Sequence, residues 1–364
     1  MQKVYIYLEN GTYLQGHSFG ANKTAIGKIV YNNATFGYQE IVTDPSNAGL
    51  FVNFTAVEIG NSGTNKVDME SSKAHVSGMI VRNYHDAYSN YRADMSLAEF
   101  LKSQDVIGVC DIDTRYMTKI VRDEGSQMMV ASTEISSKDE LAKLLKDAKK
   151  YDETNFIETC STNDIYIHKS GAWNNDIQDF NKAKMSDKKV VVYDFGVKKS
   201  FLNELVESGL EVEVVPNKTC ADEIIKRFND KQIGGVVLSS GAGNPNIYKN
   251  EIENIKKLID ANVPMLAVGL GHYLLTIASG GKIEKIKSIK AGSHPVKGEK
   301  TVEIYSINTE YEIKDFDKYA EVTYTKAFDN TAVALKYKNK DILTSEFTPV
   351  SNSSIYKEFA SLVK

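Results

Sequence analysis

Residues 263–275 read Val-Pro-Met-Leu-Ala-Val-Gly-Leu-Gly-His-Tyr-Leu-Leu. The apolar run from Pro264 to Val268 predicts a buried strand, and the residues after it predict a helix that begins near His272. A strand that turns sharply into a helix through small residues is the elbow by which α/β hydrolytic folds present a nucleophile. The corner residue should then be serine or cysteine, but here it is Gly269. The sequence therefore predicts an enzyme architecture without its nucleophile.

The chain around this elbow alternates between strand and helix patterns from residue 189 onward. We expect strands at 190–193, 211–215 and 235–238, and helices at 198–208, 221–228 and 249–261. This alternation predicts a parallel, doubly wound α/β sheet. Ligands of such sheets bind at the carboxyl ends of the strands, where both the elbow and the turn at 239–245 are expected.

The first part of the chain has a different pattern, which is rich in short strands and turns. Ser96 followed by Glu99 is a capping box and predicts a helix over 96–103; further helices are expected at 114–124 and 137–151. We predict three segments: a β-rich N-terminal domain at 1–151, a polar linker at 152–188, and the α/β domain at 189–364. In the linker, Trp173 is expected to anchor the segment to one of the domains.

The composition limits the classes of protein to which the chain can belong. The chain has 364 residues, 42% hydrophobic and 25% charged, which is typical of a soluble protein of about two domains. A net charge of −4 argues against nucleic acid and anionic membranes as partners. The chain has an odd number of cysteines, Cys110, Cys160 and Cys220, without C-x-x-C spacing, which argues against disulfides and a zinc site. We therefore expect a cytoplasmic protein without a bound metal.

The glycine-containing turns predict a place where backbone amides approach a ligand. Gly241 and Gly243 allow close approach, and the amide of Leu270 could point to the same place. Two such donors would form an oxyanion hole for acyl transfer. Either turn alone could also simply end a strand.

Several longer motifs carry a family resemblance. They are 35–40 (Thr-Phe-Gly-Tyr-Gln-Glu), 43–46 (Thr-Asp-Pro-Ser), 59–65 (Ile-Gly-Asn-Ser-Gly-Thr-Asn), 111–115 (Asp-Ile-Asp-Thr-Arg), 193–198 (Tyr-Asp-Phe-Gly-Val-Lys), 239–245, 269–272 and 292–296 (Gly-Ser-His-Pro-Val). With these motifs the chain resembles, over essentially its whole length, the small subunit of carbamoyl phosphate synthetase. That subunit is a class I glutamine amidotransferase, which hydrolyses glutamine and passes ammonia to a large subunit.

The resemblance implies that the catalytic triad is degenerate. Active members use a cysteine at the elbow and a histidine and a glutamate in a C-terminal Gly-His-Pro-Glu motif. The elbow position is Gly269 in this chain. Pro349 fixes the register of the second motif, so that Thr348 replaces the histidine and Val350 the glutamate.

The resemblance also implies an altered glutamine pocket. Four residues remain at positions that the family uses to bind glutamine, namely Ser46, Gly241, Gly243 and Leu270. Asn308 and Tyr311 match a neighbouring segment of the family pattern. Tyr273 and Glu310 replace a glutamine and a glycine of the family pattern, and we expect them to obstruct the pocket. Glu310 could also form an acidic pair with Glu346.

Three functions remain open. The first is a structural subunit without glutaminase activity, which docks on a large subunit and itself binds no cofactor. That large subunit would use free ammonia and bind ATP and bicarbonate. The complex would serve arginine or pyrimidine biosynthesis. The second is an altered hydrolase with a replacement nucleophile, for which Cys220 is a candidate. The third is a binding module for an amine ligand at Tyr273 and Glu310.

Overall fold

The computed structural model describes residues 1–298 and 302–364; the side chains of 287–291 and 306–309 are also outside the description. The described residues form two compact units. The first consists of Met1–Thr154 and Ile286–Gly292, and the second of Asn155–Lys285 and Ser293–Lys364. Among these residues, no helix has the length and apolar character required to cross a bilayer.

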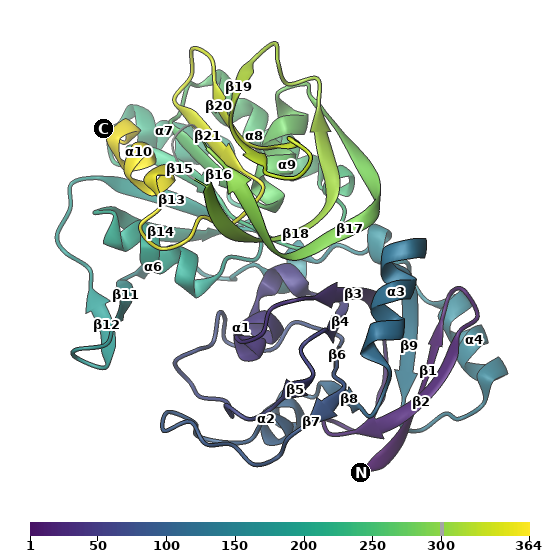
Figure 1. Cartoon of the computed structure of the whole chain (residues 1–364). Helices are drawn as coiled ribbons and strands as arrows, with labels where there is room; N and C mark the ends of the chain where they lie inside the picture. The colour runs from purple at the N-terminus through teal and green to yellow at the C-terminus, as the bar shows by residue number, and fades with distance from the viewer. Residues whose placement is uncertain (299–301) are drawn as a thin grey trace. The chain divides into compact units, whose positions relative to one another are not determined.

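The first unit is built on a closed barrel (Figure 1). Its strands follow the order β1 (Gln2–Leu8), β2 (Tyr13–Ser18), β8 (Ile107–Cys110), β6 (Gly78–Ile80), β4 (Leu50–Phe54), β3 (Thr24–Asn32) and β9 (Met128–Ser132). Alternate residues of these strands fill the barrel, among them Val4, Ile6 and Leu8, which are fully buried. The β-rich character predicted for the N-terminal domain is confirmed.

Helices of the first unit follow the predicted signals closely. Helix α2 (Leu97–Ser103) begins after Ser96, whose hydroxyl accepts from the amide of Glu99 while the Glu99 carboxylate accepts from the amide of Ser96. Helix α3 (Thr114–Glu124) ends at Gly125, as expected. Helix α4 (Lys138–Asp147) is shorter than predicted, because its last turn gives way to an extended Ala148.

The second unit contains a ten-stranded sheet within the described part of the chain (Figure 1). Its strands are β10 (Tyr166–His168), β14 (Glu211–Pro216), β13 (Lys189–Asp194), β15 (Gly235–Leu238), β16 (Met265–Val268), β21 (Ile342–Ser345), β20 (Ala332–Tyr337), β19 (Ala320–Lys326), β17 (Lys282–Lys297) and β18 (Val302–Lys314), in that order. The five strands from β14 to β21 are parallel to one another. The predicted doubly wound sheet is therefore confirmed.

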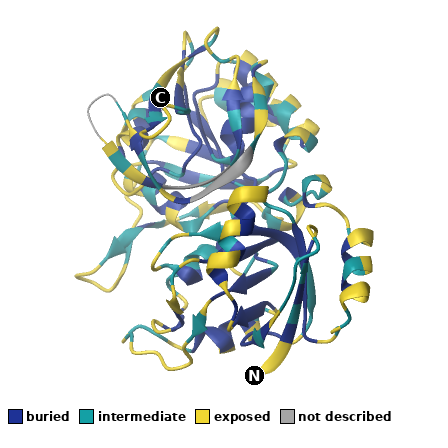
Figure 2. Cartoon of the chain, turned by 45° about the vertical axis from the view of Figure 1, so that its right-hand side comes forward, coloured by how far each residue is buried: buried dark blue, intermediate teal, exposed yellow. Residues whose placement is uncertain are grey.

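Helices cover both faces of this parallel sheet. Helices α7 (Ala221–Asn229), α8 (Lys249–Asp260) and α9 (Leu270–Ala278) pack on one face, and α6 (Lys199–Glu207) and α10 (Ser354–Leu362) on the other. Along β16 the side chains alternate between the two hydrophobic clusters, Met265 and Ala267 facing one and Leu266 and Val268 the other. Figure 2 shows the resulting buried strands beneath helices with exposed outer faces.

Residues 152–188, for which the sequence predicts a linker, carry β10 and a two-stranded hairpin of β11 (Ser170–Asn174) and β12 (Asp179–Lys182). Strand β10 pairs with β14 and so extends the main sheet. In the hairpin, the rings of Trp173 and Phe180 meet edge to face at 5.2 Å, and the Trp173 indole donates to Asn175. The hairpin also contacts α6, where the Glu207 carboxylate accepts from the amide of Ala172.

Candidate functional site

The elbow lies between β16 and α9, both within the second unit. Gly269 follows Val268 directly and has φ 54° and ψ −117°, a conformation that side-chain-bearing L-residues rarely adopt. Helix α9 begins at Leu270, two residues earlier than the predicted start near His272, because the carbonyl of Gly269 accepts from the amides of His272 and Tyr273. The elbow geometry predicted from the sequence is present, with a glycine at its corner.

The C-terminal segment predicted to hold the degenerate motif starts beside this elbow. Strand β21 pairs in parallel with β16, so that Ser345 is the partner of Val268, and the amide of Gly269 donates to the carbonyl of Ser345 at 2.9 Å. Thr348 follows three residues later and is half-buried, while Val350 is exposed. Neither side chain can accept a proton from a nucleophile at neutral pH.

Pro349, which fixes the register of that motif, is itself held in place. It is buried, and its carbonyl accepts from the Tyr356 hydroxyl at 2.7 Å. Two residues before it, the Phe347 ring stacks on Tyr305 with 3.9 Å between centroids. The segment is therefore an ordered part of the second core.

Glu346 begins this segment and has a basic partner that the sequence pattern does not reveal. Its carboxylate lies 3.2 Å from the Lys326 ammonium, and the two side chains are only 3% and 4% exposed. Lys326 is the last residue of β19 and is distant from Glu346 in the sequence, so no local spacing of residues predicts the ion pair. The acidic pair of Glu346 with Glu310 stays a prediction.

The glycines of the 239–245 turn are required by packing. A β-carbon at Gly241 would lie 2.3 Å from the carbonyl oxygen of Phe195, and one at Gly243 would lie 2.3 Å from the Tyr248 hydroxyl. Gly243 also has φ 96°. These contacts account for both glycines without a ligand, so their part in an oxyanion hole stays a prediction.

The amide of Leu270 lies at the start of α9, directly after the corner. It is the first residue of α9, so its N–H has no acceptor within the helix. The next amide, that of Gly271, already donates to the carbonyl of Ser239 at 3.0 Å. Binding of an anion by Leu270 remains a prediction.

The predicted pocket residues are only partly brought together. Tyr273 and Tyr311 are both 7% exposed, their rings meet edge to face at 5.8 Å, and the Tyr273 hydroxyl donates to the Tyr311 carbonyl at 3.3 Å. Glu310 is half-buried beside Tyr311 on β18. Asn308 lies outside the residues whose side chains are described.

Ser46 belongs to the first unit and is held by a local contact there. It lies in a short 3-10 helix, Pro45–Asn47, where its amide and hydroxyl both donate to the Asp44 carboxylate, at 2.8 and 2.7 Å. These contacts describe Ser46 within its own unit only.

His272, next to the elbow, is a buried neutral imidazole. Its Nδ1 lies 2.9 Å from the Thr344 hydroxyl, and its Nε2 has no hydrogen-bond partner among the described residues. Complete burial lowers its pKa to about 3. The imidazole packs between α9 and β21 and is not exposed to a substrate.

The structure places the three cysteines in different local environments. Cys110 lies on β8 of the first unit, where burial raises the pKa of its thiol to about 12. Cys220 is exposed before α7, and its thiol donates to the Asp222 carboxylate at 3.6 Å. Cys160 is half-buried, 3.9 Å from the Thr159 hydroxyl. The described residues also contain no group of side chains arranged to bind a metal ion.

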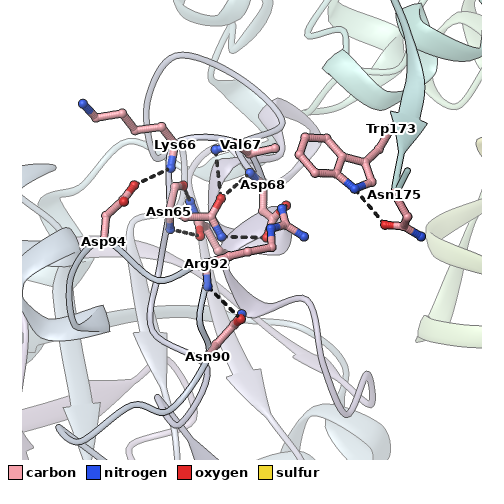
Figure 3. Close-up of polar contacts among 10 residues, drawn as sticks. Asn65, Lys66, Val67, Asp68, Asn90, Arg92, Asp94, Trp173 and Asn175 are labelled. Atoms are coloured by element: carbon pink, nitrogen blue, oxygen red, sulfur yellow. Dashed lines mark hydrogen bonds and ion pairs between the residues drawn. The ribbon is translucent and has the colours of Figure 1, made fainter. Parts of the chain in front are cut away.

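The motif at 59–65 ends in a polar network of the first unit (Figure 3). The Asn65 side chain donates to Asp68 at 2.7 Å, and Arg92 from the following loop donates to the same carboxylate. The amide of Asn65 donates in turn to the Gln39 side chain at 2.9 Å. The network therefore joins the motifs at 35–40 and 59–65 to the loop that carries Arg92.

Comparison with known proteins matches each part of the chain to a family. Residues 6–131 match "Carbamoyl-phosphate synthase small chain, CPSase domain", and residues 191–355 match "Glutamine amidotransferase class-I". A carbamoyl phosphate synthase small chain of Campylobacter jejuni is 43% identical, covering 99% of this chain and all of that protein. The Helicobacter pylori small chain is 41% identical over 99% of both chains, and the chloroplastic Arabidopsis thaliana small chain is 34% identical, covering 99% of this chain and 85% of that protein.

Proposed function

The chain belongs to the family of carbamoyl phosphate synthase small chains, and we propose that it is a member without glutaminase activity. In this role it is a structural subunit that docks on a large subunit, and the large subunit takes ammonia from solution. ATP and bicarbonate bind to the large subunit, and this chain binds no cofactor. The observation that carries the proposal is the glycine at the corner of an intact strand-to-helix elbow.

The neighbourhood of the elbow supports the same conclusion. A covalent route to glutamine hydrolysis needs a thiol or hydroxyl at the corner and a base within hydrogen-bond reach. The segment that begins beside the corner presents Thr348 and Val350, which supply no base. The nearby imidazole of His272 is bonded to Thr344 inside the core and stays unprotonated.

The pocket side chains give a second, independent support. Tyr273 and Tyr311 pack against one another, with the hydroxyl of one bonded to the backbone of the other. Two phenol rings in mutual contact leave their buried faces unavailable to a substrate amide. We infer that glutamine is excluded at this position even where the elbow itself is preserved.

The test is carbamoyl phosphate synthesis by a large subunit from the same organism, with and without this chain. Ammonium should support synthesis, and glutamine at the same concentration should not. A complex of the two chains should be seen by size-exclusion chromatography. Synthesis supported by glutamine, and lost when the chain is omitted, would overturn the proposal and favour a replacement nucleophile.

A further inference from the structure

We propose that a polar pocket at the carboxyl end of β14 binds a small zwitterion, namely a free α-amino acid with an uncharged polar side chain. The pocket has a volume of about 370 Å³, and its lining belongs wholly to the second unit. It is separate from the elbow, because β13 and β15 lie between β14 and β16 in the sheet. The inference therefore goes beyond the proposed function and does not depend on it.

Two segments of the chain form the walls of this pocket. One is the end of helix α5 (Ile157–Cys160) with the residues that follow it, and the other is the turn after β14. The amide of Asn217 donates to the Ser161 hydroxyl at 3.0 Å, which joins the two walls. The amide of Thr162 donates to the buried Asp194 carboxylate at 2.8 Å, which ties the first wall to the end of β13. Both walls are thus fixed to the sheet.

Polar groups of the lining have bonding capacity left for a ligand. Asn217 is only 6% exposed, and its Nδ2 donates to the Glu251 carboxylate at 2.9 Å. Among the described residues none donates to its Oδ1. The Asn163 amide and the Thr219 hydroxyl add further donors and acceptors to the same lining. A few such groups in a concave site are what fixes the orientation of a small ligand.

An ion pair joins the two walls at their exposed side. The Lys218 ammonium lies 3.5 Å from the Glu158 carboxylate, and the two side chains are 73% and 53% exposed. Exposed ion pairs of this kind contribute little to stability, so this one opens at low cost. A ligand that carries both an ammonium and a carboxylate satisfies both side chains at once, with its carboxylate on Lys218 and its ammonium on Glu158.

The charge balance and size of the pocket select the class of ligand. In the described lining, Lys218 and Glu158 are the charged residues, and their charges cancel. A simple anion or cation would leave one of the two without a partner, whereas a zwitterion leaves neither. The volume is near the lower end of the range of small-molecule sites, about 300–1,000 Å³, which suits a free amino acid.

The test uses the full chain and L-asparagine, whose side-chain amide is uncharged and both donates and accepts hydrogen bonds. Dissociation constants are measured by saturation-transfer NMR, with two derivatives for comparison. N-acetyl-L-asparagine lacks the ammonium, and L-asparagine amide lacks the α-carboxylate. L-asparagine should bind about tenfold more tightly than either derivative, as expected for the loss of one charge-assisted contact.

Two variants should exchange the preference between the derivatives. Lys218→Met leaves the Glu158 carboxylate, so that L-asparagine amide becomes the best of the three ligands. Glu158→Gln leaves the Lys218 ammonium, so that N-acetyl-L-asparagine becomes the best. The control is Lys336→Met, which breaks an exposed ion pair elsewhere in the same unit and should keep the preference of the natural chain. A purely structural role of the Lys218–Glu158 pair would not reverse the preference in opposite directions.

Three results would overturn the inference. The first is that L-asparagine does not bind to the natural chain at millimolar concentrations. The second is equal affinity for the three ligands, and the third is an unchanged preference in both variants of the ion pair. Glutamine hydrolysis by the natural chain would count against the proposed function alone, because the pocket and the elbow lie at different strands.

Discussion

Gly269 differs from a serine or cysteine at the same corner by more than one missing atom. Its φ of 54° is retained although no side chain has to be presented there. The amide of the same residue is hydrogen-bonded to the carbonyl of Ser345 on β21. The local structure has therefore kept the turn of a strand-to-helix elbow at a residue that has no side chain.

His272 gives a prediction at the same scale, because its burial makes stability depend on pH. Its pKa is lowered from 6.5 to about 3 in the folded chain, so the unfolded chain binds the proton more readily. The stabilisation is fully present above pH 6.5 and is lost progressively as the pH falls from 6.5 towards 3. Between pH 7 and pH 5.5 this single group should remove about 1 kcal/mol of unfolding free energy.

The measurement is urea unfolding at both pH values for the natural chain and for His272→Gln. The variant should lose less stability on acidification, by about that amount. The pH dependence of His75→Gln, in the first unit, is measured alongside that of His272→Gln, because burial also lowers the pKa of His75, to about 4. An unchanged pH dependence in His272→Gln would show that the imidazole is protonated or exposed in the folded chain.

Among the elements, the end of β19 and the exit of β21 are joined by the buried Lys326–Glu346 pair. Removing one member leaves an uncompensated buried charge, so Lys326→Met alone should cost about 3–5 kcal/mol of unfolding free energy. The double variant Lys326→Met/Glu346→Leu should cost clearly less, because apolar replacement of a whole buried pair is often neutral.

The control for this prediction is an exposed pair in the same unit. The Lys336 ammonium lies 2.7 Å from the Glu358 carboxylate, with side chains 52% and 40% exposed. Lys336→Met should change the unfolding free energy by less than about 1 kcal/mol. Similar costs for the two lysine variants, in chemical denaturation, would contradict the buried placement of Lys326.

How far these elements could be predicted depended on the range of the interactions that form them. Helices α2 and α3 and the parallel strands β13 to β16 follow local signals, such as the Ser96 cap and the apolar runs, so their positions were predicted closely, whereas the parallel strand β21 was not predicted. The barrel closure and the antiparallel strands beyond residue 282 depend on pairing between distant segments and were not predicted. Within the site, the glycine at the corner could be predicted from its neighbours in the sequence, whereas the ion pair between Lys326 and Glu346 joins segments that no local pattern connects.

At the scale of the whole molecule, each of the two units has its own hydrophobic core. The first unit retains a closed barrel and the Asn65–Asp68–Arg92 network. The second retains a complete doubly wound sheet with helices on both faces. The proposed docking role requires a folded subunit, and an intact fold around an elbow without a nucleophile agrees with that proposal.

The most direct test of this account is ammonia release from L-glutamine, measured on the purified full chain with its large subunit present. The account predicts no release above that of the large subunit alone. Release that rises with the amount of this chain would contradict it, and loss of that release in Cys220→Ser would identify Cys220 as the replacement nucleophile.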